Sequence, residues 1–284
     1  MNILFSTWLL LRDTVEGFVE DDGLSRGASI AYYTLFSIAP VLLVVVAIAG
    51  LAFGREAAEG AIVAQLSLLM GRQTAEALQA MVESAAKPRE GLLATITGVV
   101  VLIVATTGVF GEVQAGLNGI WKAGPSKSST LSRLLRARLT SISLVVVTGF
   151  LLTVSLATSA ALASVSTYLK YAFPAAGVAL NIIDVVLSGL LIAGLFAAMF
   201  KVLPDTPIAW RDVGLGAVAT TILFEGGKYA IAFYVGTSNV ASSYGAAGAL
   251  IVLLVWIYYS AQIFLLGAEF TRAFAKRYGS HASP

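Results

Sequence analysis

One stretch of an otherwise apolar segment, ATTILFEGGKYAIAFY, contains an acid and a base three residues apart. At this spacing Glu225 and Lys228 share one face of a helix, with Gly226 and Gly227 between them. A charge at the centre of a membrane-spanning helix costs about 2.5–3.5 kcal/mol on insertion scales. Each glycine weakens a helix by about 1 kcal/mol relative to alanine, but lets another helix or a ligand approach the backbone closely. Two interpretations are open: a polar site facing a water-filled cavity, or an ion pair that locks this helix to its neighbours.

Several polar residues elsewhere in the apolar segments extend this candidate site. Asp184 is a candidate partner for Lys228, and Tyr229 follows Lys228 directly. Pro40 is a candidate hinge, because proline removes a backbone N–H and kinks a helix. The secondary polar positions are Glu112, Asn118, Tyr244 and Glu269. An interfacial structural role is expected for Glu112, Asn118 and Glu269, which lie at the ends of spans.

The composition of the chain indicates a membrane protein. Of its 284 residues, 58% are hydrophobic and 12% are charged, whereas soluble domains carry about 25% charged residues. Backbone polar groups must be satisfied within lipid, so each apolar segment of about 20 residues predicts a transmembrane helix. The fold class is therefore all-α, a polytopic membrane protein formed by one domain over residues 1–284. Six such segments are predicted, at residues 28–53, 92–112, 139–162, 178–200, 213–234 and 246–269.

Two further regions predict helices that do not span the membrane. Residues 1–26 predict a cytoplasmic amphipathic helix, and its acids favour packing on the bundle over anchoring to anionic lipid. Residues 54–90 predict a periplasmic loop of two amphipathic helices, broken at Gly71 and ended by Pro88. Trp256 and Tyr259 lie deeper in the last span than an aromatic belt, so they are expected to face protein or a cavity.

The distribution of Lys and Arg predicts the orientation. Twelve lie in the segments on the side of the two termini and five lie in the opposite loops, which places both termini in the cytoplasm. The cytoplasmic segments include a basic loop over residues 122–138 and a tail over residues 271–284. We therefore predict a multi-pass protein of the inner (plasma) membrane whose partners include membrane lipids.

Other classes of function lack the residues they need. The chain has no cysteine and its single histidine, His281, is close to the C-terminus, so neither a metal site nor a cofactor is predicted. The net charge of +2 supplies no basic face for nucleic acid. Hydrolase, nucleotide-binding and metalloprotease motifs are missing, and the protein is not expected to be an enzyme.

Four stretches of the sequence resemble the YihY/BrkB family of bacterial inner-membrane proteins. They are AYYTLFSIAP at 31–40, PDTPIAWRDVGLGA at 204–217, the region of Glu225 and Lys228, and YGAAGALIVLLVWIYYSAQIFLLGAE at 244–269. The resemblance covers residues 28–269 and implies six helices with cytoplasmic termini. Members have been labelled as ribonuclease BN, as serum-resistance virulence factors and as transporters. The ribonuclease label finds no support here, because this chain lacks clustered His and Asp ligands and a basic surface.

Two hypotheses for function follow. The first is a transporter or exporter of an unidentified small molecule, amphipathic or lipid-like, that passes through a polar site in the helix bundle. The second is a non-transporting scaffold or envelope-integrity factor, and a homo-oligomer is left open in both. In the first hypothesis the residues that line the path are Glu225, Lys228, Asp184, Gly226, Gly227 and Tyr229.

Overall fold

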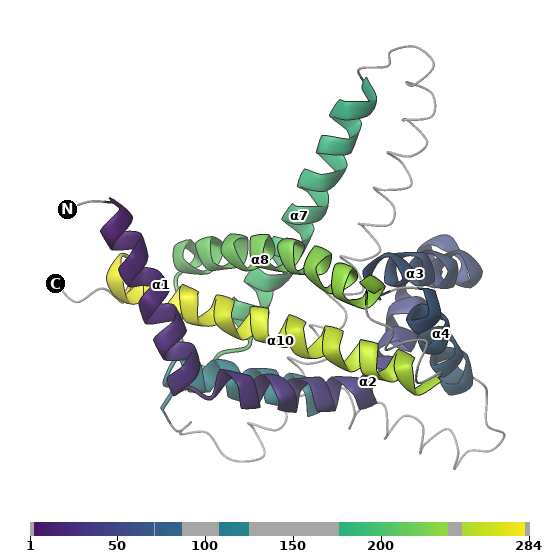
Figure 1. The fold of residues 1–284 in the computed structure, drawn as a ribbon, viewed down its shortest axis with the longest axis horizontal. Coiled ribbons are helices and arrows are strands. Elements are labelled where there is room, and N and C mark those ends of the chain that lie inside the picture. The colour runs from purple at the N-terminus through teal and green to yellow at the C-terminus, as the bar shows by residue number, and fades with distance from the viewer. Residues whose placement is uncertain (1–2, 71, 87–107, 125–175, 238–245, 282–284) are drawn as a thin grey trace.

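The computed structural model describes residues 3–281, except for residue 71 and the ranges 87–107, 125–175 and 238–245. Throughout this part the regular structure is helical, which confirms the all-α class (Figure 1). A further helical segment, residues 108–120, lies between two of the omitted ranges. The helices are α1 (Ile3–Glu20), α2 (Gly23–Phe53), α3 (Arg55–Met70), α4 (Arg72–Ala86), α7 (Ala176–Val202), α8 (Trp210–Thr237) and α10 (Ala246–Arg277).

The C-terminal helix α10 is the central element of the bundle. It packs along α8 and α2, and it also contacts α1, α3 and α4. α7 packs on α8, and α3 and α4 pack on each other and on α2. Figure 1 shows the beginning of α1 and the end of α10 at one end of the molecule, and α3 and α4 at the other.

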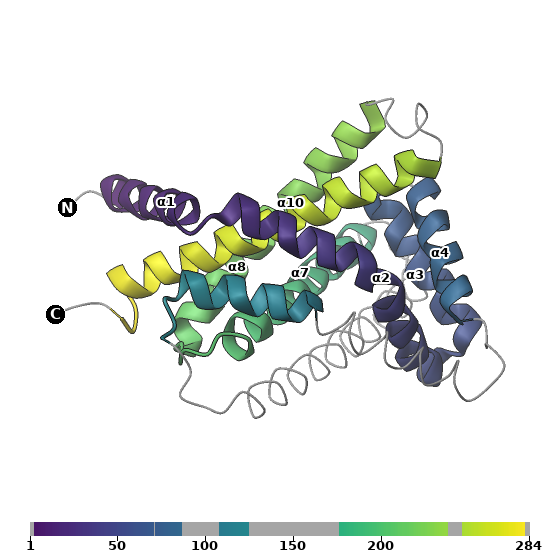
Figure 2. The ribbon, with the colours of Figure 1, turned by 90° about the horizontal axis from the view of Figure 1, so that it is seen from below.

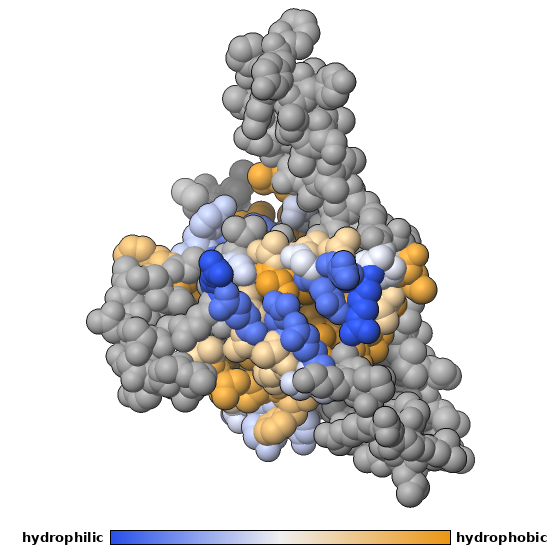
Figure 3. Space-filling model, turned by 90° about the vertical axis from the view of Figure 1, so that its right-hand side faces the viewer, coloured by the Kyte–Doolittle hydropathy of each residue, from blue (hydrophilic) through white to orange (hydrophobic). Residues whose placement is uncertain are grey.

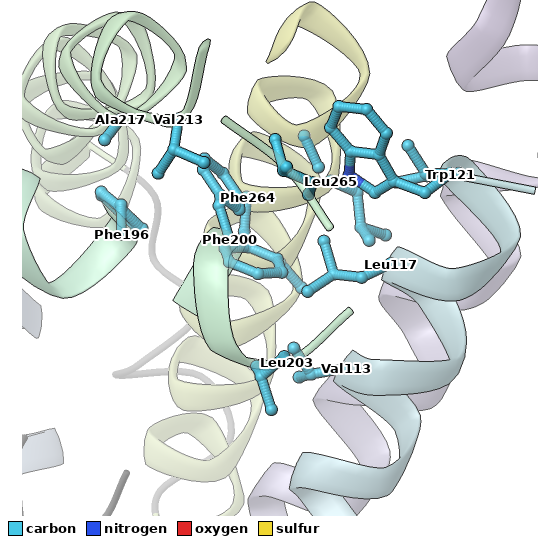
Figure 4. Close-up of a cluster of buried hydrophobic side chains, with 14 of the residues drawn as sticks. Val113, Leu117, Trp121, Phe196, Phe200, Leu203, Val213, Ala217, Phe264 and Leu265 are labelled. Atoms are coloured by element: carbon cyan, nitrogen blue, oxygen red, sulfur yellow. The ribbon is translucent and has the colours of Figure 1, made fainter. Parts of the chain in front are cut away.

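A core of large apolar side chains joins α7, α8, α10 and the segment 108–120 (Figure 4). Its aromatic centre is Phe200, whose ring centroid lies 5.1 Å from that of Phe264 and 6.3 Å from that of Phe196. Such ring pairs contribute about 0.5–1.5 kcal/mol beyond the area that they bury. Leu117 and Leu265 are fully buried beside them. The C-terminal halves of α7 and α10 and the N-terminal half of α8 are therefore fixed against one another by close packing.

Three described helices are long and apolar enough to cross a membrane: residues Gly23–Leu51, Val185–Val202 and Gly248–Arg277. They coincide with the first, fourth and sixth predicted spans. α8 matches the fifth in position and is 28 residues long, but its charged and glycine-containing centre lowers its hydropathy. The second and third predicted spans, 92–112 and 139–162, lie largely outside the described residues, so six spans remain a prediction.

The boundaries of two helices differ from the predicted ones. α2 begins at Gly23, five residues earlier than predicted, after a tight turn in which Asp22 has a φ of 54°. A Cβ at Gly23 would overlap the ring of Phe18, so this turn requires glycine. α10 stays helical to Arg277, well into the predicted tail. α2 also remains helical through Pro40, and Figure 2 shows that it bends along its length.

The predicted pair of loop helices is confirmed by α3 and α4. α3 ends at Met70 and α4 begins at Arg72. Gly71 and Pro88 themselves lie outside the described residues. Exposed ion pairs such as Arg72–Glu76, 2.6 Å apart, lie on this part of the protein. Hydrophilic side chains gather on the face that carries these helices (Figure 3). This surface suits contact with water more than contact with lipid.

Candidate functional site

The acid and the base of α8 form an ion pair with each other. Lys228 Nζ lies 2.7 Å from Glu225 Oε2, and the two side chains are 24% and 33% exposed. In the described part of the chain, neither side chain forms an ion pair with another element. The interpretation that this pair locks α8 to its neighbours therefore finds no support among the described contacts.

The two glycines between the charges have different surroundings. A Cβ at Gly227 would overlap the ring of Tyr259 on α10, with its Cζ only 2.7 Å away. Gly226 is exposed, and a Cβ there would meet nothing within 4 Å. Gly227 thus lets the aromatic side chain of α10 lie against the backbone of α8. Gly226 has no such packing role among the described residues.

The same helix pair contains a reciprocal small-residue contact that the sequence reasoning missed. A Cβ at Gly216 of α8 would overlap Thr271 of α10, and a Cβ at Gly267 of α10 would overlap Thr220 of α8. Both threonine hydroxyls donate to the carbonyl four residues earlier, at 2.7 Å. Each helix therefore presents a Gly-xxx-Thr motif, a form of the small-xxx-small pattern that brings membrane helices together. That spacing is a signal that was present in the sequence.

The aromatic residues of α10 face the protein, as predicted. The ring of Trp256 packs edge-on against Phe224 of α8, with centroids 5.9 Å apart. Phe224 in turn packs against Phe196 of α7 at 5.7 Å. Directly before Glu225, at Phe224, α8 is therefore held by aromatic packing from two sides.

The remaining predicted path residues are not brought together by described contacts. Tyr229 is 75% exposed and points away from the core. Asp184 lies in the first half of α7, but its side chain is outside the part of the structure that is described, as is Tyr244. Glu112 is half-buried in the segment 108–120. The roles of Tyr229 and Asp184 in a path, and of Glu112 and Tyr244 as secondary polar positions, stay predictions.

Asn118 has a structural contact with the connection between α7 and α8. Its amide nitrogen donates to Asp205 Oδ2 at 2.7 Å, and its amide oxygen accepts from the Asp205 N–H at 2.8 Å. Gln114 also donates to the Asp205 carboxylate, at 3.4 Å. This clamp is consistent with the interfacial role expected for Asn118.

Glu269 belongs to a charged network at the end of the molecule where α1 and α10 meet. Its Oε2 lies 3.5 Å from Arg272 Nη1, and the same Nη1 lies 3.2 Å from Asp21 Oδ2. Lys122 also pairs with Asp21, while Arg277 Nη2 lies 2.7 Å from an Asp13 oxygen. These contacts join the α1–α2 turn, α10 and the chain that follows segment 108–120.

Two pockets stand out in the described part of the protein, and Glu225 and Lys228 line neither of these two. One, of about 460 Å³, lies between α1 and the last turns of α10. The other, of about 20 Å³, is an apolar void between α2, α3 and α4. Among the described residues, no group of three or more acidic or His side chains is arranged to hold a metal ion.

Three apolar helices of spanning length in an all-helical fold indicate the class of all-helical membrane proteins. A family model described as virulence factor BrkB matches residues 14–284. The chain therefore belongs to the virulence factor BrkB family, which confirms the resemblance to YihY/BrkB proteins.

Relatives in several bacteria are called UPF0761 membrane proteins. The chain is 29% identical to one from Alcanivorax borkumensis over 261 residues, which is 91% of this chain and 58% of the relative. It is 28% identical to one from Psychrobacter (93% and 48%) and 27% identical to one from Legionella pneumophila (93% and 61%). The chain thus spans about half to three-fifths of the length of these curated relatives. No solved structure matches it.

Proposed function

We propose that this protein is an inner-membrane transporter or exporter of an amphipathic, lipid-like substrate, and that Glu225 and Lys228 line the path. The observation that carries the proposal is an ion pair inside one helix whose side chains are 33% and 24% exposed. Because the two charges pair only with each other among the described residues, no described contact between helices offsets the cost of inserting them into the membrane. A polar group inside a span that lacks a structural tie is a functional-site hypothesis by default.

The proposed topology has six spans with both termini in the cytoplasm. The three candidate spans and α8 supply four of them, and the predicted segments 92–112 and 139–162 would supply the others. The excess of Lys and Arg on the side of the termini supports this orientation. The beginning of α1 and the end of α10 lie at one end of the bundle (Figure 1), which supports an even number of spans.

The glycines and the hinge have separate parts in the proposal. Gly226 leaves the backbone of α8 open beside the ion pair, so a substrate could approach it there. Tyr229 and Asp184 would extend the polar lining along α8 and α7. Pro40 lies in a helix that bends, and motion at this point would open or close one side of the bundle.

Movement of a fluorescent phospholipid in proteoliposomes tests this proposal. NBD-labelled phosphatidylethanolamine and phosphatidylglycerol would be followed by dithionite bleaching of the outer leaflet. We expect the wild type to exceed protein-free vesicles, and Glu225→Gln and Lys228→Met each to slow movement about tenfold or more, which is about 1.4 kcal/mol in the barrier. Glu76→Gln and Arg72→Met remove the same charges from the exposed pair on α4 and should not change the rate.

Two outcomes count against the proposal. Unchanged movement in both α8 variants would remove these residues from the mechanism. A wild-type protein that moves neither lipid, while a defined envelope partner co-purifies with it, would favour the scaffold hypothesis instead.

A further inference from the structure

The cavity between α1 and α10 has the size of a ligand-binding site. Its volume is about 460 Å³, and pockets for small molecules usually measure about 300–1,000 Å³. Glu16 and Glu20 line it from α1, and Arg272 and Lys276 line it from α10. The cavity is distinct from the Glu225–Lys228 pair. Tyr259 of α10 packs against Gly227, between the two charges, and Glu269 follows Tyr259 by ten residues, or about 15 Å along α10.

One wall of the cavity contains a buried acceptor that lacks a donor. Glu269 is 2% exposed, and its Oε1 is buried without a hydrogen-bond partner among the described residues. Gly17 makes room for this carboxylate, because a Cβ there would lie 2.7 Å from Oε2. An unsatisfied buried polar group costs about 1–3 kcal/mol, and more when it is charged. A ligand that brings N–H donors into the cavity would remove this cost.

The charges around the cavity are separated into an acidic and a basic side. Asp13, Glu16 and Glu20 lie on one stripe of α1, and Arg272 and Lys276 lie one turn apart on α10. Asp13 and Glu16 already pair with arginines, each at 2.7 Å. Within the described chain, Glu20 and Lys276 form no ion pair. The cavity therefore offers one carboxylate and one ammonium to a ligand, in addition to Glu269.

We propose that this cavity binds a phosphoethanolamine group, either as the headgroup of a phospholipid or as a free molecule. The primary ammonium donates to Glu269 Oε1 and faces Glu20, and the phosphate faces Lys276. A trimethylammonium group has no N–H to donate, so phosphocholine does not satisfy Glu269. A purely anionic headgroup would add negative charge beside four carboxylates and bring no cation.

The outer face of α1 favours the lipid as the source of this group. Trp8, Leu11, Val15 and Val19 are 49–68% exposed on the helix that lines the cavity. α1 also leads into the candidate span of α2 through a turn of two residues. An apolar face in this position lies at the membrane interface and can contact the acyl chains of a lipid whose headgroup is in the cavity. The site does not depend on the proposed transport activity.

Native mass spectrometry of the full chain tests the proposal. The detergent-solubilised protein would be mixed with equal amounts of phosphatidylethanolamine, phosphatidylcholine and phosphatidylglycerol that have the same acyl chains. We expect the ethanolamine lipid to be retained about tenfold over the choline lipid, a difference of about 1.4 kcal/mol. Glu269→Gln and Lys276→Met should each reduce this preference severalfold. Glu76→Gln and Arg72→Met, which change the same charges on α4, should leave it intact.

Competition with free O-phosphoethanolamine distinguishes the two sources. Displacement of the lipid by millimolar free compound would assign the cavity to the soluble molecule, and retention of the lipid would assign it to the headgroup. Equal retention of ethanolamine and choline lipids by the wild type, without binding of the free compound, would overturn the proposal. So would an unchanged preference in both Glu269→Gln and Lys276→Met. Since Lys276 is exposed, its variant remains informative if the Glu269 variant does not fold.

Discussion

The centre of α8 and the junction of α1 with α10 both combine acids with bases, but they use them differently. In α8, Glu225 and Lys228 pair within one helix and remain partly exposed. At the junction, Asp21 bonds Arg272 of α10 and Lys122 from the chain after segment 108–120, and its side chain is 8% exposed. The first arrangement joins nothing else among the described residues, whereas the second joins three parts of the fold.

This difference predicts that the two groups of charges contribute differently to stability. A buried ion pair is strongly destabilising to break, because removing one partner leaves the other charge buried and alone. A partly exposed pair on one helix contributes about 0–1 kcal/mol. The junction is therefore expected to stabilise the fold, and the pair in α8 is expected to be dispensable for folding.

The largest expected effect is the loss of the shared carboxylate at the junction. Asp21→Ala leaves Arg272, whose side chain is 14% exposed, without its partner from the α1–α2 turn. We expect the free energy of unfolding in detergent to fall by about 3 kcal/mol. The comparison variant, Glu225→Gln combined with Lys228→Met, should lose less than about 1 kcal/mol. Equal losses in both proteins would contradict the distinction between the two regions.

A smaller effect is expected from the two adjacent glycines of α8. Gly227→Ala forces its Cβ into the ring of Tyr259, and overpacking of this kind costs about 1–3 kcal/mol. Gly226→Ala enters open space and should stabilise the helix by up to about 1 kcal/mol. Thermal unfolding of the two variants measures the difference.

A double-mutant cycle identifies the partner of Gly227. In the background of Tyr259→Ala, the cost of Gly227→Ala should shrink, because the overlapping ring is gone. An undiminished cost would assign the effect to another neighbour of α8.

Much of the fold was predictable because the features concerned are local. Length and hydropathy indicate the spans that became α2, α7 and α10, and amphipathic patterns indicate α3 and α4. The boundaries depend on tertiary contacts instead. The last turns of α10 are held by Arg277, which bonds Asp13, and by the following Ser280, which donates to Asp212 of α8 at 2.6 Å. Contacts between residues so distant in sequence have no local signature.

The candidate site was predictable to the same extent. The spacing of Glu225 and Lys228 alone predicts that they can pair on one helix face, and they do. The different roles of Gly226 and Gly227 depend on where Tyr259 lies, so composition and spacing could not separate them. The buried acceptor of Glu269 is likewise a property of the α1–α10 contact, in which Gly17 approaches it.

The proposed path requires that Glu225 and Lys228 face a water-filled interior. Because the chain contains no cysteine, a single introduced cysteine reports whether water reaches its position, without labelling of native thiols. In sealed membrane vesicles, Glu225→Cys and Lys228→Cys would be treated with a membrane-impermeant maleimide, which reacts with thiolates formed in water. Leu190→Cys, at an apolar position of α7 that is 62% exposed within a candidate span, provides the lipid-facing control.

We expect labelling at positions 225 and 228 from at least one side of the membrane, and none at position 190. Absence of labelling at both 225 and 228, in vesicles where Arg72→Cys on α4 reacts, would contradict it. The pair would then lie in lipid or in dry packing, and α8 would contain no path.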